Sequence, residues 1–496
     1  MALIGLDVGG TGAKAVAFGE GGVILSSAYQ EYDMIQDHPG WYELDPHRMF
    51  DAAYNVLRKA AADCPEEVKG IGVSSFGESF IFMDENEEIL CRSIMYLDTR
   101  GEEYVDEMRD MIKDDVEGFR LRTGTLPRNL QSIYKIRVLE QYNPGILART
   151  KKVHFIADFV LSRLGGEHVT DYGLAATTGA FDINKKEWIT DMFEWAGLDP
   201  AVLPKPVPTG STFGHLSKKA AEDLGLKEGI VLISGGHDHV PSSLGSGVYR
   251  AGTAMNAIGT VDTFMLITDQ VEAAQSYSGF KPHLLPGHYQ FAPGGNLTGG
   301  VLLKWFRDHI GKYEKNMWAA EGKDFYAEYE KQMPQEPTDL LVLPRFGGYG
   351  NTFADRAGIL NLTLSTTNEE IYRAFMESET YEMYTGLKRH MDKFGPLSGV
   401  TAVNGGANCA TYMQIRADIY NVPVSTINCP QPGAMGDAML AGIQAGIYKD
   451  VHEAVADCVK VRRVFEPNAK NHEYYMGMYE KYMKVYEFMK SIEAGK

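Results

Sequence analysis

The stretch ALIGLDVGGTGAKAVAFGEGGVILSSAYQEY, residues 2–32, decides the fold. It contains three apolar runs separated by two short glycine-rich turns, GGTG at 9–12 and GEGG at 19–22. Short turns of this kind join neighbouring antiparallel strands. The stretch therefore predicts a three-stranded antiparallel meander at the start of the chain.

Helix and strand signals alternate after this meander. Asp45-Pro46 predicts a helix start, because Asp can cap a helix and Pro suits its first position. Apolar residues at helical spacing follow between 49 and 60, and VKGIGVSSF at 68–76 is typical of a strand. This alternation favours the α/β fold class.

A second segment repeats the plan of the first. AGTAMNAIGTVDTFMLITD, residues 251–269, places a small Gly-Thr turn between two apolar strands. We interpret the repeat as two similar halves, an N-terminal domain at 1–246 and a C-terminal domain at 247–496, with a cleft between them. Helical spacing of Tyr and Met predicts a terminal helix within 460–496.

Composition limits the partners of the protein. The 496 residues carry a formal charge of −18, which disfavours binding to nucleic acid or to an anionic membrane surface. The five cysteines are far apart and form no CxxC pair, as expected in a reducing compartment. No signal peptide or apolar run long enough to span a membrane is found, so we expect a cytoplasmic protein.

The first turn has the residue types of a phosphate-binding loop. Gly10 lets a polyphosphate approach backbone N–H groups, while Thr11 and Lys14 offer a hydroxyl and a cation. Asp7, at the end of a strand, can hold Mg²⁺ through water. The alternative is a tight hairpin turn whose charged side chains are simply solvated.

The segment SGGHDH, residues 234–239, supplies a candidate base. Asp238 follows a buried strand and two glycines, and a carboxylate there can accept the proton of an attacking hydroxyl. Two alternatives stay open. His237, Asp238 and His239 can ligate a metal, although neighbours on an extended segment are expected to point apart, and Asp238 can cap a following helix.

Two further glycine turns lie in the second half. Gly259-Thr260 can present an N–H group and a hydroxyl to a terminal phosphate, and it repeats the first turn. Gly405, Gly406 and Asn408 lie in NGGAN between a predicted strand and helix, which suits a nucleoside at a helix N-terminus. A simple turn is the alternative at both places.

Polar residues at two strand ends suit a hydroxyl-bearing acceptor. Glu78 ends SSFGES, and Asp98 and Arg100 lie in YLDTR. Carboxylates and Arg are directional partners for sugar hydroxyls. A surface salt bridge between Asp98 and Arg100 is the alternative.

Taken in order, four segments resemble the FGGY family of carbohydrate kinases, a branch of the actin-like ATPase fold group. They are DVGGTGAKAV from 7, GGHDHVPSSLGSGV from 235, AIGT from 257 and NGGANCATYMQIRADIYNVPV from 404. The resemblance implies two actin-like, ribonuclease H-like ATPase domains, with the acceptor on the N-terminal side and the nucleotide on the C-terminal side. It also implies transfer of the γ-phosphate of Mg-ATP to a hydroxyl of a pentulose, hexulose or polyol, and a possible homodimer.

The resemblance also implies a role for each candidate residue. Asp238 would be the general base and Asp7 would place Mg²⁺. The remaining roles concern the two substrates: Gly10, Thr11, Lys14, Gly259 and Thr260 would serve the ATP phosphates, Gly405, Gly406 and Asn408 the adenosine, and Glu78, Asp98 and Arg100 the acceptor.

The segments expected to bind the acceptor match no single subfamily. Xylulokinase-like members usually carry Met-His where this chain has Gly77-Glu78, and the Glu is more similar to glycerol kinases and autoinducer-2 kinases. Glycerol kinases, however, have Trp where this chain reads Tyr96. The sequence therefore predicts a sugar or polyol but no particular one.

Two other classes of function compete with a kinase. One is a nucleotide-driven ATPase switch of the same fold, which needs no acceptor, and the other is a catalytically silent sugar sensor. The carboxylate of GGHDH and the polar segments SSFGES and LDTR argue against the switch. The complete set of Asp7, Asp238 and both Gly-Thr turns argues against the sensor.

Overall fold

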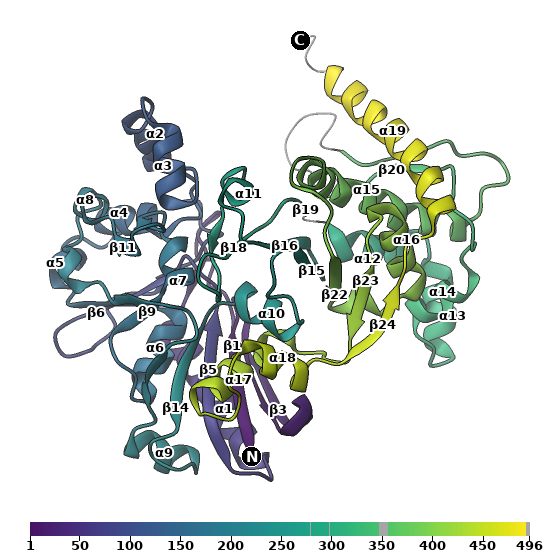
Figure 1. The fold of residues 1–496 in the computed structure, drawn as a ribbon. Coiled ribbons are helices and arrows are strands. Elements are labelled where there is room, and N and C mark those ends of the chain that lie inside the picture. Colours follow the sequence, from purple (N-terminus) through teal and green to yellow (C-terminus); the bar gives the residue numbers. More distant parts are fainter. Residues whose placement is uncertain (278, 297, 347–355, 493–496) are drawn as a thin grey trace. The chain divides into compact units, whose positions relative to one another are not determined.

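The computed structural model describes residues 1–277, 279–296, 298–346 and 356–492 (Figure 1). The chain forms two compact units. Unit 1 comprises Met1–Tyr249, Thr268–Phe291 and Gln431–Lys460, and unit 2 comprises Arg250–Ile267, Ala292–Pro430 and Val461–Lys496. Each unit is therefore built from several separate stretches of chain.

Unit 1 is organised around a six-stranded sheet. Its order is β13-β14-β5-β1-β2-β3, and its strands are β1 (Ala2–Val8), β2 (Gly12–Phe18), β3 (Ile24–Glu31), β5 (Val68–Ser75), β13 (Thr212–His215) and β14 (Val231–His237). Strands β1, β2 and β3 are antiparallel neighbours, which confirms the predicted meander. Strand β5 lies parallel to both β1 and β14.

Helix α1 (Pro46–Asp63) covers strands β2 and β3. The side chain of Asp45 accepts hydrogen bonds from the N–H groups of His47 and Arg48, so the predicted cap and helix start are confirmed. Its buried face includes Met49, Val56 and Leu57, as the helical spacing indicates.

Helix α17 (Pro432–Gln444) packs on β1, β5 and α10 (His239–Gly245) within unit 1. This packing is very close: a Cβ atom at Gly5 would lie 1.8 Å from the carbonyl oxygen of Ala434. A single boundary after residue 246 would assign α17 to the second half of the chain, whereas the compact unit that contains it is unit 1.

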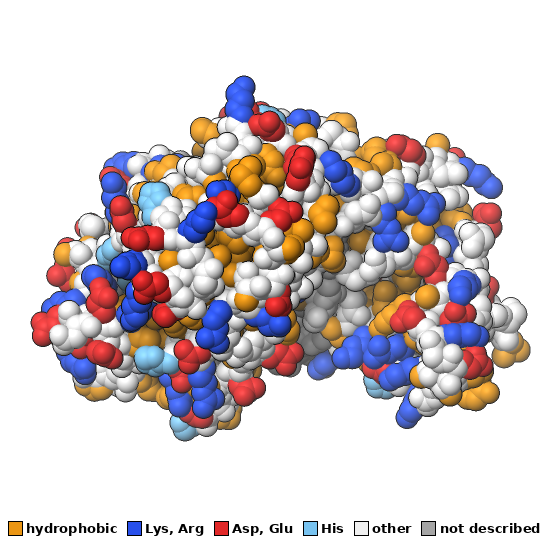
Figure 2. Space-filling model, turned by 90° about the horizontal axis from the view of Figure 1, so that it is seen from below, with side chains coloured by type: hydrophobic (Ala, Val, Ile, Leu, Met, Phe, Trp, Pro, Cys, Tyr) orange, Lys and Arg blue, Asp and Glu red, His pale blue; other side chains and the backbone are white. Residues whose placement is uncertain are grey.

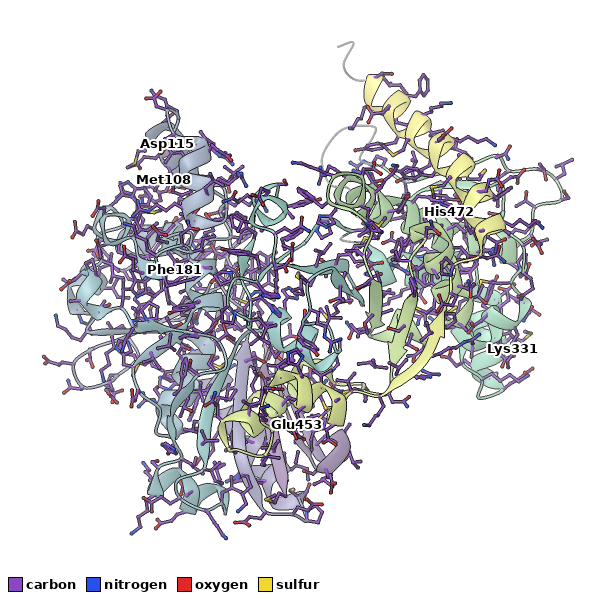
Figure 3. The ribbon with its side chains drawn as sticks, in the orientation of Figure 1. Met108, Asp115, Phe181, Lys331, Glu453 and His472 are labelled. Carbon is purple, nitrogen blue, oxygen red and sulfur yellow. The ribbon has the colours of Figure 1, made fainter. Side chains whose placement is uncertain are left out.

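The other elements of unit 1 surround this sheet. The helices are α2 (Glu102–Met111), α3 (Val116–Thr123), α4 (Ser132–Tyr142), α5 (Ile146–Arg149), α6 (Ile156–Leu164), α7 (Tyr172–Thr177), α8 (Thr190–Trp195), α9 (Lys218–Leu224), α11 (Val271–Gln275) and α18 (Val451–Cys458). The short strands are β4 (Glu43–Leu44), β6 (Phe80–Met83), β7 (Ser93–Ile94), β8 (Lys152–Phe155), β9 (Val169–Asp171), β10 (Phe181–Asp182), β11 (Glu187–Trp188), β12 (Lys205–Val207), β17 (Lys281–Pro282) and β18 (Tyr289–Phe291). Phe181, labelled in Figure 3, is fully buried and packs edge-on against Trp188.

Unit 2 repeats the strand plan of unit 1. Its strands follow the order β16-β15-β22-β23-β24, with β15 (Thr253–Ile258), β16 (Asp262–Thr268), β22 (Gly399–Val403), β23 (Val424–Ile427) and β24 (Val461–Phe465). The pairings are antiparallel, parallel, parallel and antiparallel, as they are along β2-β1-β5-β14-β13. The predicted hairpin repeat is thus confirmed, and it extends to five strands.

Six helices of unit 2 and three short strands complete the described part of this unit. They are α12 (Gly299–His309), α13 (Lys312–Ala320), α14 (Phe325–Gln332), α15 (Asn368–Phe394), α16 (Ala410–Tyr420) and α19 (Ala469–Ser491), with β19 (Gly295–Asn296), β20 (Leu341–Leu343) and β21 (Gly358–Leu360). Helix α19 confirms the predicted terminal helix, and its His472 contacts the carbonyl oxygen of Asp418 on α16 (Figure 3). Residues 461–465 form β24 instead, because an edge strand pairs through its backbone and needs no apolar periodicity.

Charged side chains of both signs cover the surface. Figure 2 shows lysine and arginine side chains interspersed with acidic ones over the face that it draws. Among the described residues, no helix is both long and apolar enough to cross a membrane.

Candidate active site

The first Gly turn of unit 1 places a carboxylate and a cation on neighbouring strands. Asp7 on β1 lies directly opposite Lys14 on β2. The turn between them is closed by a hydrogen bond from the N–H of Gly9 to the carbonyl oxygen of Gly12, at 2.9 Å. Thr11 is exposed at its tip, and Lys14 Nζ donates to Gln431 Oε1 at 2.9 Å. The predicted loop is therefore built as a turn with accessible polar groups.

The surroundings of Asp7 disfavour its charged form. Its pKa is raised to about 7, chiefly by burial and also by the negative charge of Asp238, while the positive charge of Lys14 opposes both effects. Two carboxylates that repel each other in a partly buried site are suited to a divalent cation, which relieves both costs at once.

Asp238 stands where β14 ends and α10 begins. Its backbone N–H donates to the carbonyl oxygen of Ser75 on β5 at 2.9 Å, which fixes its position on the sheet. The carboxylate makes no capping hydrogen bond to α10, so the alternative of a helix cap is not supported. The side chain is 36% exposed, while its Oδ1 atom is buried and accepts no hydrogen bond from the described residues.

Two imidazoles flank this carboxylate. His237 Nδ1 lies 3.6 Å and His239 Nε2 lies 3.9 Å from Asp238 Oδ1. One ligand atom from each of the three residues lies within 4.8 Å of the others. The expectation that these neighbours point apart is wrong, because the chain leaves the strand at 237 and turns into a helix at 239.

The imidazole of His237 is neutral. Burial lowers its pKa well below the ordinary value, and the positive charges of Lys281 and His239 act in the same direction. His237 therefore does not supply a positive charge to Asp238.

A third acidic residue was missed in the sequence. Asp437 on α17 is fully buried and accepts a hydrogen bond from Ser74 Oγ at 2.7 Å. Burial raises its pKa well above the ordinary value, as do Asp7 and Asp238. A Cβ atom at Gly235 would lie 1.7 Å from Asp437 Oδ1, so a larger residue there would have to displace this carboxylate. A lone acid within the small-residue run GAMGDAML was the available signal.

Glu78 has an unusual backbone. Its φ is +64°, a left-handed conformation that is rare for residues other than glycine and is common at functional sites. Its N–H donates to Thr177 Oγ1 at 3.0 Å. Lys281 Nζ on β17 lies 3.7 Å from Glu78 Oε1, and this lysine was not predicted because it lies far away in sequence.

Tyr96 lies in the same electrostatic field. Burial raises its pKa, and the charges of Asp238 and Glu78 add to this effect. Its ring is 6.1 Å from the ring of Phe76, centroid to centroid. Tyr96 is thus an aromatic side chain close to both Glu78 and Asp238.

Asp98 and Arg100 form an ion pair, at 2.6 Å from Arg100 Nη2 to Asp98 Oδ2. The pair is buried rather than on the surface, and the guanidinium also contacts Glu43 Oε1 at 2.8 Å and stacks on Trp41. Among the residues that the structure describes, no hydrogen bond or ion pair connects either side chain to Glu78 or Asp238.

In unit 2, the Gly259-Thr260 turn joins β15 to β16. The N–H of Gly300, at the start of α12, donates to the carbonyl oxygen of Gly259 at 2.8 Å. Helix α12 therefore begins directly against the turn, and Thr260 in this turn is exposed.

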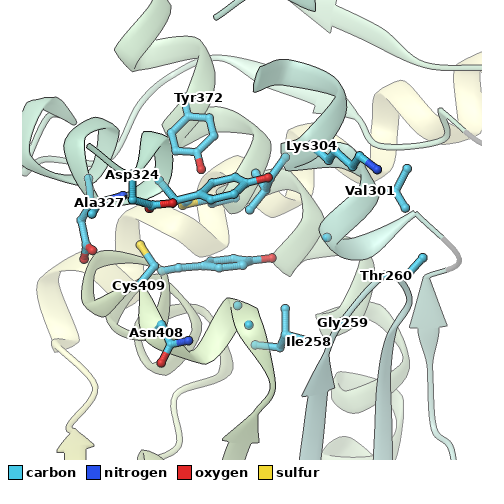
Figure 4. A pocket seen from close by; sticks show the side chains of 18 residues that line it. Ile258, Gly259, Thr260, Val301, Lys304, Asp324, Ala327, Tyr372, Asn408 and Cys409 are labelled. Carbon is cyan, nitrogen blue, oxygen red and sulfur yellow. Dashed lines mark hydrogen bonds between the residues drawn. The ribbon is translucent and has the colours of Figure 1, made fainter. Parts of the chain in front are cut away.

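A cavity of about 600 Å³ opens beside this turn. Figure 4 shows Thr260 and Lys304 at one end of the cavity and Asp324 and Ala327 at the other. Its walls carry aromatic and sulfur-containing side chains, namely Tyr326, Tyr372, Met376, Cys409 and Tyr412. This volume and these walls suit a nucleobase and its ribose.

The predicted NGGAN segment lines the same cavity. Gly405, Gly406 and Asn408 lie in the short 3-10 turn η4 (Gly405–Asn408), before α16. A Cβ atom at Gly406 would lie 2.2 Å from Ile258 Cγ2, so glycine is needed where the turn packs against the end of β15. Unit 2 thus brings all five of its predicted residues together.

The family is established by comparison with known proteins. The model of the N-terminal domain of the FGGY family of carbohydrate kinases matches residues 2–245, and that of the C-terminal domain matches residues 254–445. The chain therefore belongs to the FGGY family of carbohydrate kinases. It is an ATP-dependent sugar or polyol kinase, a phosphotransferase with an alcohol group as acceptor.

Individual relatives are distant but cover nearly the whole chain. A xylulose kinase of Staphylococcus epidermidis is 25% identical over 500 residues, which are 99% of this chain and 98% of that protein. A gluconokinase of Bacillus subtilis is 28% identical over 470 residues, 92% of this chain and 90% of that protein. The crystal structure of xylulose kinase from Rhodospirillum rubrum shares the fold, with a TM-score of 0.87, 24% identity and 99% coverage of both chains.

Proposed function

We propose that Asp238 is the general base of the phosphoryl transfer. Its carboxylate would accept the proton of the acceptor hydroxyl as that oxygen forms a bond to the γ-phosphorus of ATP. The bond from this phosphorus to the β,γ-bridging oxygen breaks, and ADP leaves. The observation that supports this role is a fixed backbone combined with a carboxylate that α10 does not use.

The nucleotide would bind in the cavity of unit 2. The aromatic walls would hold adenine, and Gly405, Gly406 and Asn408 would lie beside the adenosine. Gly259 and Thr260, at the end of the cavity that also carries Lys304, would serve the phosphates. In unit 1, Gly10, Thr11 and Lys14 keep the role in phosphate binding that the family resemblance implies.

Mg²⁺ fits the acidic cluster of unit 1, because Asp7 and Asp238 repel each other there. Asp7 would hold the cation through water, and a bound Mg²⁺ supplies positive charge to the phosphoryl oxygens. Without the cation, a pKa of about 7 leaves Asp7 partly protonated near neutral pH.

The acceptor would lie between Glu78 and Asp238, with Tyr96 as an aromatic surface. Asp98 and Arg100 would affect acceptor binding indirectly, because they hold the turn that carries Tyr96. The N–H of Asp98 donates to the carbonyl oxygen of Met95 at 3.1 Å, and the ion pair fixes the other side of this turn.

A coupled ADP-release assay over ketoses, polyols and sugar acids tests this assignment. Acceptor-stimulated ADP formation is expected from the wild type. Asp238→Asn should lower kcat by about 10²–10⁴ with its best acceptor. Asp191→Asn, an exposed position on α8, is the matched control and should leave kcat unchanged. An Asp238→Asn enzyme with the kcat of the wild type would remove Asp238 from this role.

Two properties stay predictions. We expect a cytoplasmic protein, consistent with five cysteines that form no disulfide. We expect a homodimer from the family resemblance, and sedimentation velocity of the purified protein measures it directly.

A further inference from the structure

The acceptor of this kinase can be neutral or anionic, and the names of its relatives include both kinds: xylulose is a neutral ketose, and gluconate is a sugar acid. In unit 1, the two members of an ion pair each shift the pKa of a residue near Asp238. This pair, Glu78 with Lys281, carries an inference about the acceptor that rests on the proposed role of Asp238.

The pair is specific to the folded protein. Glu78 follows β5 and Lys281 opens β17, and β17 packs against α7, which carries Thr177. The side chain of Glu78 is 12% exposed and that of Lys281 is 20% exposed. The left-handed backbone of Glu78 is held by its hydrogen bond to Thr177. Both ends of the pair are thus positioned by surrounding structure, unlike a mobile surface salt bridge.

The pair lies beside the proposed base. A Cβ atom at Gly77, the neighbour of Glu78, would lie 2.8 Å from Cδ2 of His237, the neighbour of Asp238. In agreement with this proximity, the negative charge of Asp238 raises the pKa of Glu78, and the positive charge of Lys281 lowers the pKa of His237. Burial has the largest effect on Glu78 and raises its pKa, while Lys281 opposes that shift and favours the carboxylate. The charges of Glu78 and Lys281 therefore compensate each other.

The two side chains of the pair are further apart than a direct hydrogen bond. The separation of 3.7 Å between Nζ and Oε1 exceeds a normal hydrogen bond. An ammonium group has three donors, and a carboxylate only accepts. A hydroxyl near both groups can accept a hydrogen bond from Lys281 and donate one to Glu78. A carboxylate in the same place can bond only to Lys281, and it meets the charges of Glu78 and Asp238.

We propose that the Glu78–Lys281 pair selects a neutral polyhydroxyl acceptor and rejects sugar acids. The repulsion between an incoming carboxylate and two fixed carboxylates penalises the anion. Lys281 cannot offset this penalty, because its charge is already used by Glu78. The pair is a specificity-determining contact, and the pairs of hydroxyls on a ketose or polyol match its donor and acceptor.

Substitution of each member separates charge from shape. Glu78→Gln keeps the size of the side chain but leaves Lys281 with an uncompensated charge. The ratio of kcat/KM for the best neutral acceptor to kcat/KM for D-gluconate should then fall at least tenfold. Lys281→Met removes the cation, and the same ratio should rise, while kcat/KM for the neutral acceptor falls about tenfold. Glu87→Gln disrupts an exposed pair with Lys152, also at a positive φ, and should leave the ratio unchanged.

The assay uses the full-length enzyme with Mg-ATP and a panel of D-xylulose, D-ribulose, glycerol, sorbitol and D-gluconate. A wild type that prefers D-gluconate, or a ratio that Glu78→Gln leaves unmoved, overturns the proposal. If Glu78→Gln does not fold, Lys281→Met carries the test, and an unchanged or lower ratio overturns it. Asp238→Asn in the same panel separates the two claims. If Asp238→Asn is inactive and Glu78→Gln leaves the ratio unmoved, only the role of the pair is refuted. If Asp238→Asn is fully active, the assignment of the base is refuted.

Discussion

The guanidinium of Arg416 donates to the carboxylate of Asp262, and both side chains are completely buried in unit 2. The guanidinium also donates to the side-chain oxygen of Asn256 and to the hydroxyl of Tyr412. Asp262 begins β16, directly after the Gly259-Thr260 turn, and Tyr412 lines the cavity. One buried cation therefore ties the turn to the wall of the nucleotide cavity.

Loss of this cation should damage both stability and nucleotide binding. Arg416→Met leaves Asp262 as an uncompensated buried charge, which costs about 3–5 kcal/mol of unfolding free energy. The KM for ATP should rise as the turn loses its support. Arg92→Met, which breaks an exposed pair with Asp37, is the control. Thermal unfolding and ATP titration measure both effects, and equal stabilities of the two variants would contradict the prediction.

Gly406 should tolerate no side chain. An alanine Cβ at this position would lie 2.2 Å from Ile258, so the turn must move out of the cavity. We expect Gly406→Ala to weaken ATP binding at least tenfold, measured by isothermal titration calorimetry. Gly477→Ala on α19 meets no atom within 4 Å and serves as the control. An ATP affinity for Gly406→Ala equal to that of the control would show that the turn is not fixed at the cavity.

Asp7 should govern the requirement for Mg²⁺. Asp7→Asn removes a negative charge next to Asp238 but keeps the shape of the side chain. The Mg²⁺ concentration that gives half-maximal activity should therefore rise at least tenfold, while the KM for the acceptor changes little. Steady-state assays over a range of MgCl₂ at fixed ATP measure this shift. An unchanged Mg²⁺ dependence would exclude Asp7 as the residue that places the cation.

Asp158 should make the stability of the protein depend on pH. Burial raises its pKa well above the ordinary value, and the charge of Asp171 adds to the effect. The folded state therefore retains a proton that the unfolded chain loses above a pKa of about 3.9. Its contribution is fully present at low pH and is lost as the pH rises toward the folded pKa. Asp158→Asn does not titrate, so its unfolding temperature should exceed that of the wild type more at pH 8 than at pH 5. Equal differences at both pH values would contradict this assignment.

Much of the fold follows from local signals in the sequence. The turns GGTG and AIGT lie between apolar strands, and Asp45-Pro46 caps a helix, so these elements form where local chemistry predicts them. The assignment of α17 to unit 1 does not follow from local signals. It depends on glycines of β1 and β5, such as Gly5 and Gly72, that pack closely against α17 far along the chain.

The candidate site could be predicted to the same extent. Asp7, Asp238 and the glycine turns lie at strand ends, where the chain pattern alone marks them. Lys281 could not be found in this way, because it joins the cluster from a segment distant in sequence, and Asp437 was marked only as a lone acid in a small-residue run. The burial of Asp98 with Arg100 also depends on Trp41 and Glu43, which no spacing rule connects to them.

The central claim is that Asp238 accepts the hydroxyl proton during phosphoryl transfer. Rapid-quench measurement of a single turnover, with ATP and acceptor both saturating, isolates that step from binding and product release. The account predicts that Asp238→Asn slows the step by about 10²–10⁴ while the Kd of ATP stays within twofold of the wild type. A single-turnover rate for Asp238→Asn equal to that of the wild type would contradict it.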